Sequence, residues 1–370
     1  MANVVLYRKY RPQSFAEVAG QEHVVTTLRN AVRMGLLSHA YLFSGPRGTG
    51  KTTLARILAK TVNCKDPKNG EPCNTCEFCE EINRGGAIDL IEMDAASNRG
   101  IDEIRDLKDG ARFAPSRFRY KVFVIDEAHQ LTKDAANALL KLLEEPPSHV
   151  IIILATTEAH KMIPTIASRC QRFDFKKLTA KEVADNLESI AKQEGAAIDK
   201  EALFLIALQA EGSLRDAVSL LDKVLTFHSG SDTQKRVTTQ DIEQLLGIVD
   251  ANITGEFVEK LIEQDTKGAV EFLNQNLEKG VDPYEFAKNL VEYLRHILIL
   301  KLNPQLVITL EERFTKEQQE KIQDQAKRID QKTLTSILGH FLEAENKMKY
   351  ASIIQLPLEL AIVDSCARGK

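Results

Sequence analysis

Leu42-Phe43-Ser44-Gly45-Pro46-Arg47-Gly48-Thr49-Gly50-Lys51-Thr52-Thr53 is the stretch that decides the fold of this chain. A short apolar strand is followed by the spacing G-x-x-x-x-G-K-T and then by a helical pattern. The glycines let the backbone turn tightly and present its N–H groups inward, and the helix directs its positive dipole end at the same point. The alternative is a glycine-rich turn that only resembles a phosphate loop. It is disfavoured because strand and helix lie where the motif requires them.

The residue types of this loop predict how it holds a nucleotide. Lys51 has the length and charge to bind the β- and γ-phosphates, and the Thr52 hydroxyl is suited to ligate Mg²⁺. We therefore predict that ATP and Mg²⁺ bind here. The predicted phosphate contacts are Gly45, Pro46, Arg47, Gly48, Thr49, Gly50, Lys51, Thr52 and Thr53.

Length and composition indicate a globular protein of two or three domains. The chain has 370 residues and a net charge of −4, with apolar and charged fractions in the ordinary range. Residues 1–178 carry 26 basic and 21 acidic side chains, whereas the remainder carries 23 and 32. The basic surplus of the first part permits an anionic partner but does not establish one. No transmembrane run or signal peptide is recognisable, so we expect a cytoplasmic protein with no membrane partner.

Strand and helix patterns alternate through the first half of the chain. This alternation predicts a parallel sheet with helices on both faces. Strands are expected at 40–43, 88–93, 121–126, 150–155 and 172–175, and the clearest helices between them at 23–33, 101–110 and 133–143.

Only helices are expected after Leu178. Thr179 and Glu182 form a capping-box pattern that opens the first of them. We predict three domains, namely 1–178 for nucleotide binding, 179–245 as a small helical domain and 246–370 as an all-helical domain. Helices of the last domain are expected at 255–263, 266–278, 283–302, 316–328 and 332–349, with a last short one opening at 356.

Two carboxylates end the apolar strand 121–126, in the sequence Asp126-Glu127-Ala128-His129. Ligands bind at the carboxyl edge of a parallel sheet, so Asp126 is predicted to hold Mg²⁺ and Glu127 to polarise the attacking water. The alternative is a buried strand that ends in a solvated acidic turn. Thr156, at the tip of strand 150–155, is the predicted contact to the γ-phosphate or the water, with Thr157 as the second choice.

Two arginines are candidates for stabilising the charge of the transition state. Arg169 follows the strand–helix core and suits an arginine finger, although the sequence alone favours a surface salt bridge. Arg215 lies in the first turn of a helix, where the dipole disfavours a cation unless an anion lies nearby. Leu214 beside it is suited to pack on an adenine ring.

Four cysteines predict a structural zinc site. Cys64, Cys73, Cys76 and Cys79 have the spacing C-x8-C-x2-C-x2-C, interrupted by proline and glycine turns. Four thiolates complete a tetrahedral Zn²⁺ shell and leave no open position for catalysis. Disulfides are disfavoured in a cytosolic protein. Cys170 and Cys366 have no spacing partner and are expected to be packing residues.

Together these motifs resemble the AAA+ ATPases, and among them the gamma/tau subunits of bacterial DNA polymerase III clamp loaders. The resemblance is dense over residues 1–245 and mainly architectural beyond them. It implies an α/β P-loop AAA+ domain with a zinc knuckle at 64–79, then a helical lid and an all-α collar. The segments that carry it are 7–12, 15–21, 45–52, the four cysteines, 126–129, 139–147, 168–170 and 212–217.

The resemblance also implies how such a subunit works. Members of the family form a circular pentamer with delta- and delta-prime-type subunits, open a sliding clamp on ATP binding, grip primer–template DNA, and release the clamp on hydrolysis. Arg169 would then act in trans on a neighbour's ATP and Arg215 in cis, with Arg8, Tyr10 and Val18 near the adenine. Asn98, Arg99 and Gly100 open a helix and suit DNA phosphate contacts, although an exposed helix cap is an equal explanation.

Other interpretations stay open. A different AAA+ DNA-remodelling motor, such as a branch-migration helicase, would be hexameric and lack the zinc knuckle. A non-hydrolysing clamp-loader subunit would lack the phosphate loop. In the long form of the family, regions beyond the collar bind polymerase and helicase, so we expect this chain, which stops at Lys370, to be truncated. The expected location is the bacterial cytoplasm, in association with the nucleoid.

Overall fold

The computed structural model describes residues 5–228, 236–246, 251–307, 314 and 316–366. It divides into two compact units, Met1–Arg236 and Val237–Lys370. Each unit is described by itself. The three-domain division at residues 178 and 245 stays a prediction.

A five-stranded parallel sheet forms the centre of the first unit, as predicted. Its strand order is β2-β3-β4-β1-β5. The register pairs Asp94 with Asp126 and Ser44 with Thr156, so the chemistry-bearing strand ends lie at one edge. The strands are β1 (Ala40–Ser44), β2 (Leu90–Asp94), β3 (Lys121–Asp126), β4 (Val150–Thr156) and β5 (Gln171–Asp174). No strand of the sheet follows Asp174 in the residues that the structure describes.

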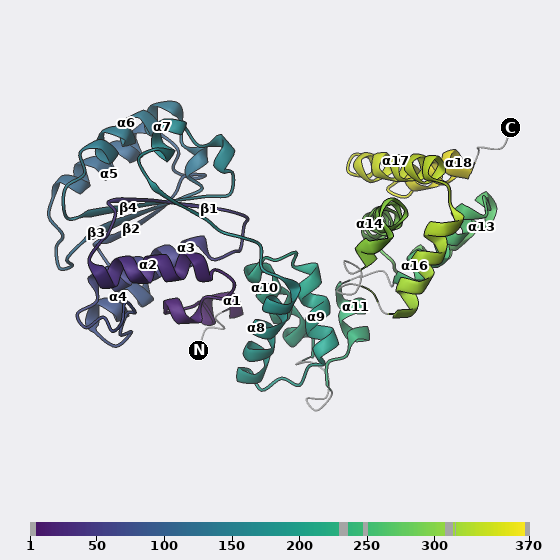
Figure 1. The fold of residues 1–370 in the computed structure, drawn as a ribbon, viewed down its shortest axis with the longest axis horizontal. Helices are drawn as coiled ribbons and strands as arrows, with labels where there is room; N and C mark the ends of the chain where they lie inside the picture. Colours follow the sequence, from purple (N-terminus) through teal and green to yellow (C-terminus); the bar gives the residue numbers. More distant parts are fainter. Residues whose placement is uncertain (1–4, 229–235, 247–250, 308–313, 315, 367–370) are drawn as a thin grey trace. The chain divides into compact units, whose positions relative to one another are not determined.

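Helices cover both faces of the sheet because successive strand residues point to opposite faces. Leu42 packs with one layer, and Tyr41 and Phe43 pack with the other. Figure 1 shows α5, α6 and α7 on one face and α2, α3 and α4 on the other. These helices are α1 (Leu6–Lys9), α2 (Glu22–Met34), α3 (Lys51–Asn63), α4 (Glu77–Arg84), α5 (Ile101–Arg112), α6 (Lys133–Glu144) and α7 (Pro164–Ala167). Short 3-10 turns lie at η1 (Phe15–Glu17), η2 (Ala128–Gln130) and η3 (Ala159–Lys161).

Three further helices complete the first unit, namely α8 (Ala180–Gln193), α9 (Lys200–Gln209) and α10 (Leu214–His228). The predicted capping box is confirmed, because Thr179 accepts from the Glu182 N–H while the Glu182 carboxylate accepts from the Thr179 N–H. Helix α10 packs against α8, α9 and α1. The N-terminal segment is thereby joined to the helical lid.

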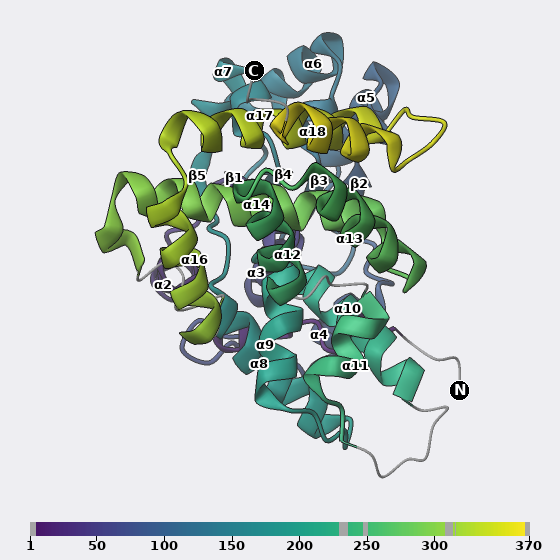
Figure 2. The same cartoon turned by 90° about the vertical axis from the view of Figure 1, so that its right-hand side faces the viewer.

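The second unit is all-helical in its described residues. Its helices are α11 (Thr239–Leu246), α12 (Ala251–Ile262), α13 (Thr266–Glu278), α14 (Pro283–Leu302), α16 (Lys316–Arg328), α17 (Gln331–Met348) and α18 (Leu356–Cys366), with a 3-10 turn η4 (Pro304–Val307). Helix α14 packs against α12, α16 and α17, and α17 lies beside α18 (Figure 2). Phe257 stacks edge-on against Phe286 and Phe341 at the core. The expected helix start at Gly255 was wrong, since α12 begins at Ala251.

A buried carboxylate fixes the loop before β3. Asp89 is buried, and its two oxygens accept backbone N–H bonds from Ser116, Arg117 and Phe118 at 2.8–3.0 Å. Burial alone would raise the pKa of Asp89, but these three N–H donors outweigh burial and lower the pKa. The charged form is therefore favoured in the folded protein.

Asp89→Asn should lower the free energy of unfolding at pH 7 by about 1–3 kcal/mol, because the amide nitrogen would face a backbone donor. A lowered folded pKa gives stability that is complete above the unfolded value near pH ~3.9 and is lost as pH falls through the folded pKa. Urea unfolding should therefore show that the free energy of unfolding of the wild type falls on acidification by this contribution. The variant lacks the carboxylate, so its free energy of unfolding should not show this fall. Asp109→Asn, at an exposed ion pair with Arg112, is the matched control and should change stability by less than about 0.5 kcal/mol. Equal effects of the two substitutions would contradict the assignment.

Candidate nucleotide and metal sites

The glycine-rich loop joins β1 to α3 as the sequence predicts. Gly45, Gly48 and Gly50 all have φ between 76° and 150°, where other residues are strained. The buried Lys51 ammonium donates to the carbonyls of Gly45 and Pro46, each at 2.7 Å. Burial lowers the pKa of Lys51, while Glu127 and Asp126 oppose this shift. A buried cation held by loop carbonyls is poised to exchange these bonds for phosphate oxygens.

Thr52 and Asp126 meet at the end of the sheet. The Thr52 hydroxyl donates to Asp126 Oδ2 at 2.8 Å, and Asp126 Oδ1 accepts from the Glu127 N–H at 2.9 Å. Two oxygen ligands from different elements thus converge at the phosphate end of the loop. Hard oxygen ligands of this kind suit Mg²⁺ together with substrate phosphates.

Glu127 is held by a network that the sequence did not predict. Its backbone is left-handed at φ 48°, and its Oε2 accepts from the Thr157 hydroxyl at 2.8 Å. His129, almost completely buried, lies with Nδ1 3.4 Å from the same oxygen and 2.9 Å from Thr156 Oγ1. Its Nε2 lies 3.0 Å from Glu158. The only sequence signal for this role was that His129 follows the acidic pair within one short turn.

The two threonines at the tip of β4 lie in different surroundings. Thr156 is fully buried, and its hydroxyl bonds to His129 and to the Glu158 N–H at 3.0 Å. Thr157 lines the cavity beside Glu127. Since side chains alternate along a strand, neighbouring threonines face opposite directions, and which of them faces the cavity depends on the register of β4.

A cavity of about 830 Å³ brings most predicted residues together. Its lining combines the loop, Asp126 and Glu127 with apolar side chains, namely Val18, Ile190 and Leu214. Tyr10 and Arg215 also line it. The predicted contacts that do not line it are Gly45, Pro46, Arg8, Thr156 and Arg169.

The lid touches the phosphate loop directly. The Leu214 N–H donates to the Gly48 carbonyl at 3.2 Å, and a Cβ built on Gly48 would lie 1.9 Å from Ser213 Oγ. Arg215 stacks over the Tyr7 ring, with Cζ 5.0 Å from the ring centroid. The first turn of α10 therefore closes on the loop, and only a residue without a side chain fits at position 48.

Gly48→Ala should destabilise the chain more than Gly35→Ala, a control with a similar φ of 69° and open space around its Cβ. Both changes incur a left-handed backbone cost of about 1 kcal/mol. Only Gly48→Ala adds the overlap with Ser213, which we expect to contribute a further ~1–3 kcal/mol. Urea unfolding of the two variants measures the difference, and equal losses would show that the lid does not rest on this loop.

Arg169 lies outside the cavity. Its guanidinium donates to Glu144 Oε1 at 2.7 Å and to the Thr165 carbonyl at 2.9 Å, and its side chain is 37% exposed. An exposed pair of this kind contributes at most about 1 kcal/mol and holds the arginine weakly. The geometry leaves Arg169 accessible to a neighbouring molecule.

Asn98 and Arg99 are exposed, and Gly100 is the N-cap of α5. The Asn98 amide donates to the Asp94 carbonyl at 3.2 Å, and the Arg99 carbonyl accepts from Thr132. The role of this turn in binding DNA stays a prediction.

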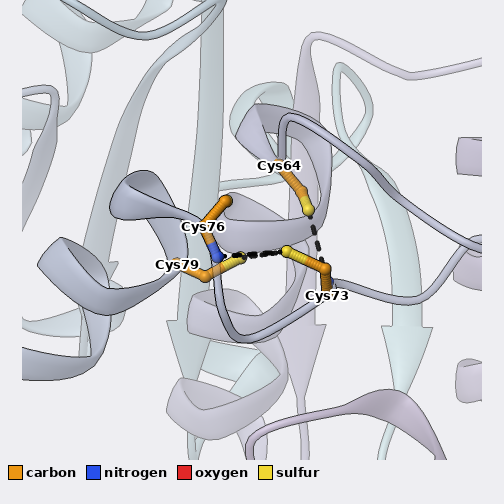
Figure 3. A group of neighbouring side chains, drawn as sticks. All are labelled: Cys64, Cys73, Cys76 and Cys79. Carbon is orange, nitrogen blue, oxygen red and sulfur yellow. Dashed lines mark hydrogen bonds between the residues drawn. The ribbon is translucent and has the colours of Figure 1, made fainter.

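The four cysteines converge as predicted (Figure 3). Their sulfurs all lie within 4.8 Å of one another, and those of Cys73 and Cys79 are 4.0 Å apart. Zn–S bonds of about 2.3 Å place the sulfurs of a tetrahedral site about 3.8 Å apart, so the cluster fits Zn²⁺. The backbone N–H groups of Cys73 and Cys76 donate to Cys64 and Cys73 sulfurs, each at 3.3 Å. Burial would raise the pKa of Cys73, but the N–H groups of Thr75 and Cys76 lower it to about 6.

The knuckle is packed onto the sheet domain. Gly70 leaves no room for a side chain, because a Cβ there would lie 2.5 Å from the Arg29 carbonyl of α2. The ring of Phe78 in α4 packs against the ring of Phe118 at a tilt, with the ring centroids 4.8 Å apart. Helix α4 itself, which carries Cys79, was not predicted. Cys170 and Cys366 lie in apolar surroundings, as expected of packing residues.

Family models match the chain in three consecutive segments. Residues 20–179 match the DNA polymerase III delta subunit, 182–230 the ATPase lid domain of the DNA polymerase III clamp loader subunit, and 237–368 domain III of subunits gamma and tau. Subunit gamma of Buchnera aphidicola is 39% identical over 302 residues, which cover 82% of each chain. This chain belongs to the DNA polymerase III gamma/tau family.

Longer relatives extend the match over the whole chain. Subunit tau of Bacillus subtilis is 42% identical over 99% of this chain, and subunit tau of Escherichia coli is 43% identical over 82%. The chain covers 64% and 46% of these two relatives. The chain therefore spans about half to two thirds of the length of these two gamma/tau relatives.

The RuvB Holliday junction branch migration motor of Thermotoga maritima shares the fold. Its structure aligns with a TM-score of 0.51 over 69% of this chain and 80% of its own, at 23% identity. This likeness shows that the gamma/tau chain shares its fold with that structure over the aligned part. No helix within the described residues is long and apolar enough to span a membrane.

Proposed function

We propose that this chain is an ATP-hydrolysing motor subunit of a DNA polymerase III clamp loader. The observation that carries the proposal is the cavity whose walls bring Lys51, Thr52, Asp126 and Glu127 together with lid residues. An inert structural subunit would not need the loop, the acidic pair and the lid contact together. Membership of the gamma/tau family supports the clamp loader as the setting.

Each residue has a proposed task in the reaction. Mg²⁺, when bound, would neutralise phosphate charge, with Thr52 and Asp126 as its protein ligands. Lys51 would orient the β- and γ-phosphates, and Arg215 would contact them from the lid. Val18 and Leu214 would enclose the adenine.

Glu127 would accept a proton from the attacking water. Its bond to Thr157 holds the carboxylate beside β4. We propose Thr157, which lines the cavity, for the contact to the water or γ-phosphate that was predicted for Thr156. Thr156 would then act indirectly, by fixing His129 behind Glu127.

ATP would act as a switch for assembly. We propose that the chain joins further copies of itself and delta- and delta-prime-type subunits in a pentamer that opens a sliding clamp around primer–template DNA. Hydrolysis would release the closed clamp on DNA. The turn at Asn98, Arg99 and Gly100 would contact DNA phosphates through exposed N–H groups and the Arg99 cation. Regions beyond this chain would bind polymerase and helicase, and the complex would work at the bacterial nucleoid.

Steady-state ATP hydrolysis, measured alone and with primed DNA and clamp, tests the proposal. We expect slow hydrolysis by the chain and stimulation when partner subunits, clamp and primed DNA are all present. Native mass measurement discriminates the alternatives, because a helicase-like motor would form hexamers. Absence of hydrolysis in every mixture would favour a non-hydrolysing subunit.

An assembly in which every copy carries Arg169→Ala should lose hydrolysis, by about 10³-fold or more if the residue is an arginine finger. A mixed assembly would then combine Arg169→Ala copies with copies that carry an intact Arg169 and a disabled phosphate loop. In that mixture, only the loop of the variant copies is active, and a neighbour supplies the arginine. Hydrolysis is expected to persist at interfaces where the intact phosphate loop of an Arg169→Ala copy faces the intact Arg169 of a neighbour. Loss at those interfaces would show that Arg169 acts on its own subunit.

A further inference from the structure

A second cavity, of about 450 Å³, adjoins the nucleotide cavity in the first unit. Tyr7, Arg11 and Arg215 belong to the walls of both. The second cavity is also lined by one side of α3 and, through Asn83, by the last turn of α4.

The lining of this second cavity contains many cations and no carboxylate. Of its 11 residues, five are basic and none is Asp or Glu, whereas basic residues make up 49 of 370 in the whole chain. The nucleotide cavity, by contrast, contains four acidic residues among its 28. The five cations are Arg8, Arg11, Arg56, Lys60 and Arg215.

Little negative charge compensates these cations. Arg56 is paired with Glu92, which does not line the cavity. Lys60 is 2% exposed, and its ammonium donates to two neutral amide oxygens, Gln13 Oε1 at 3.0 Å and Asn83 Oδ1 at 2.8 Å. Burial lowers the pKa of Lys60, and the nearby Cys79, Cys64 and Cys73 sulfurs and the Glu17 carboxylate oppose this shift. None of these four groups lines the second cavity.

The remaining three arginines crowd one another. Arg8 and Arg215 both lie over the single ring of Tyr7, with their Cζ atoms 5.8 and 5.0 Å from the ring centroid. Burial lowers the pKa of Arg11, and the neighbouring charges of Arg56 and Arg215 lower it further, with Glu92 opposing them. Holding like charges together in a partly buried cavity is unfavourable unless an anion occupies it.

Position along α3 links this cavity to the phosphate site. Thr52, Arg56 and Lys60 are spaced by four residues and share one side of the helix. The side of α3 that meets the proposed Mg²⁺ ligands therefore continues into the cationic cavity. We propose that this cavity binds a second phosphate-class anion, a phosphate monoester or pyrophosphate group, beside the nucleotide.

Calorimetric titration of the full chain with pyrophosphate tests this proposal. A slowly hydrolysed ATP analogue and excess Mg²⁺ first saturate the phosphate loop. We expect one pyrophosphate to bind per chain, at least tenfold more weakly after Arg56→Gln and with recovery in Arg56→Lys. Arg84→Gln, which removes an exposed arginine from a comparable pair with Glu80, should have no effect. Binding should also weaken as salt is raised.

Three outcomes would overturn the inference. They are no saturable binding, pyrophosphate affinity that Arg56→Gln leaves unchanged, and Arg56-dependent binding of a single-stranded oligonucleotide but not of pyrophosphate. The last outcome would assign the cations to a phosphodiester backbone. Failure of the ATP analogue to bind would instead contradict the proposed function. In that case, titration of the Lys51→Ala chain with pyrophosphate would still test this second site, because that chain lacks the lysine of the phosphate loop.

Discussion

Lys51→Ala is expected to reduce ATP hydrolysis by about 10²–10³-fold or more. Lys51 is the one lysine whose ammonium is buried inside the glycine-rich loop, between the carbonyls of Gly45 and Pro46. Charge-assisted bonds to phosphate oxygens are among the strongest that a side chain can make, and no neighbouring group in the loop replaces them.

Thermal unfolding separates loss of binding from loss of folding. A nucleotide at 100 times its Kd adds about 2.7 kcal/mol to wild-type stability, which raises the Tm by several degrees. Lys51→Ala should abolish that shift. Without nucleotide the variant should be as stable as the wild type, because the substitution removes a buried cation whose pKa burial already lowers.

Lys51→Arg and Lys133→Ala are the controls. Arginine keeps the charge but presents a planar fork that does not fit the same loop, so activity should stay low. Lys133 is exposed at the start of α6, and its removal should leave hydrolysis unchanged. Clamp loading or hydrolysis by Lys51→Ala at wild-type rates would exclude the phosphate loop as the motor site.

Cys79→Ser is expected to release zinc and to produce the largest loss of stability. Cys79 is completely buried, and its sulfur lies 4.0 Å from the sulfur of Cys73. Structural zinc contributes an apparent free energy of about 10–16 kcal/mol in small zinc domains, so even part of it exceeds the ~0.5–3 kcal/mol of an ordinary substitution. The wild type should hold one zinc per chain by elemental analysis, and the variant close to none after dialysis against a chelator.

The matched control is Cys170→Ser. Cys170 is also partly buried, but burial among apolar side chains raises the pKa of its thiol to about 11, and it lies outside the cluster. Its substitution should leave the zinc content at one per chain and the chelator-induced fall in Tm intact. A wild type without zinc, or a Cys79→Ser variant that retains it, would contradict the assignment of the knuckle.

Local sequence chemistry was enough to predict the framework. The phosphate loop was recognisable because its glycines, lysine and threonine act within twelve residues of one another. The capping box at Thr179 and the cysteine cluster are short-range for the same reason. Parallel β–α alternation places all carboxyl ends of the strands together, so the edge of the sheet that carries Asp126 was predictable, whereas the order of the strands was not.

Other features depend on contacts between residues far apart in the sequence. Thr157, directly after β4, donates to Glu127, and His129 contacts Glu127 and Thr156 from a turn that no spacing pattern predicts. The buried role of Asp89 arises from three N–H groups about 28 residues later. Helix α4 was missed because the cysteine pattern dominates that stretch of sequence.

The sequence by itself therefore determined the fold class and was enough to predict the phosphate loop, the acidic pair and the cysteine cluster, since each depends on residues near one another along the chain or on strand ends that meet at one edge. Only the tertiary structure decided which residues share a cavity. Arg11, Arg56 and Arg215 come from three separate segments, and nothing in their spacing predicts that they converge. Their charges add at one place because the N-terminal segment, the phosphate-loop helix and the lid pack together, and electrostatic interaction depends on distance in space.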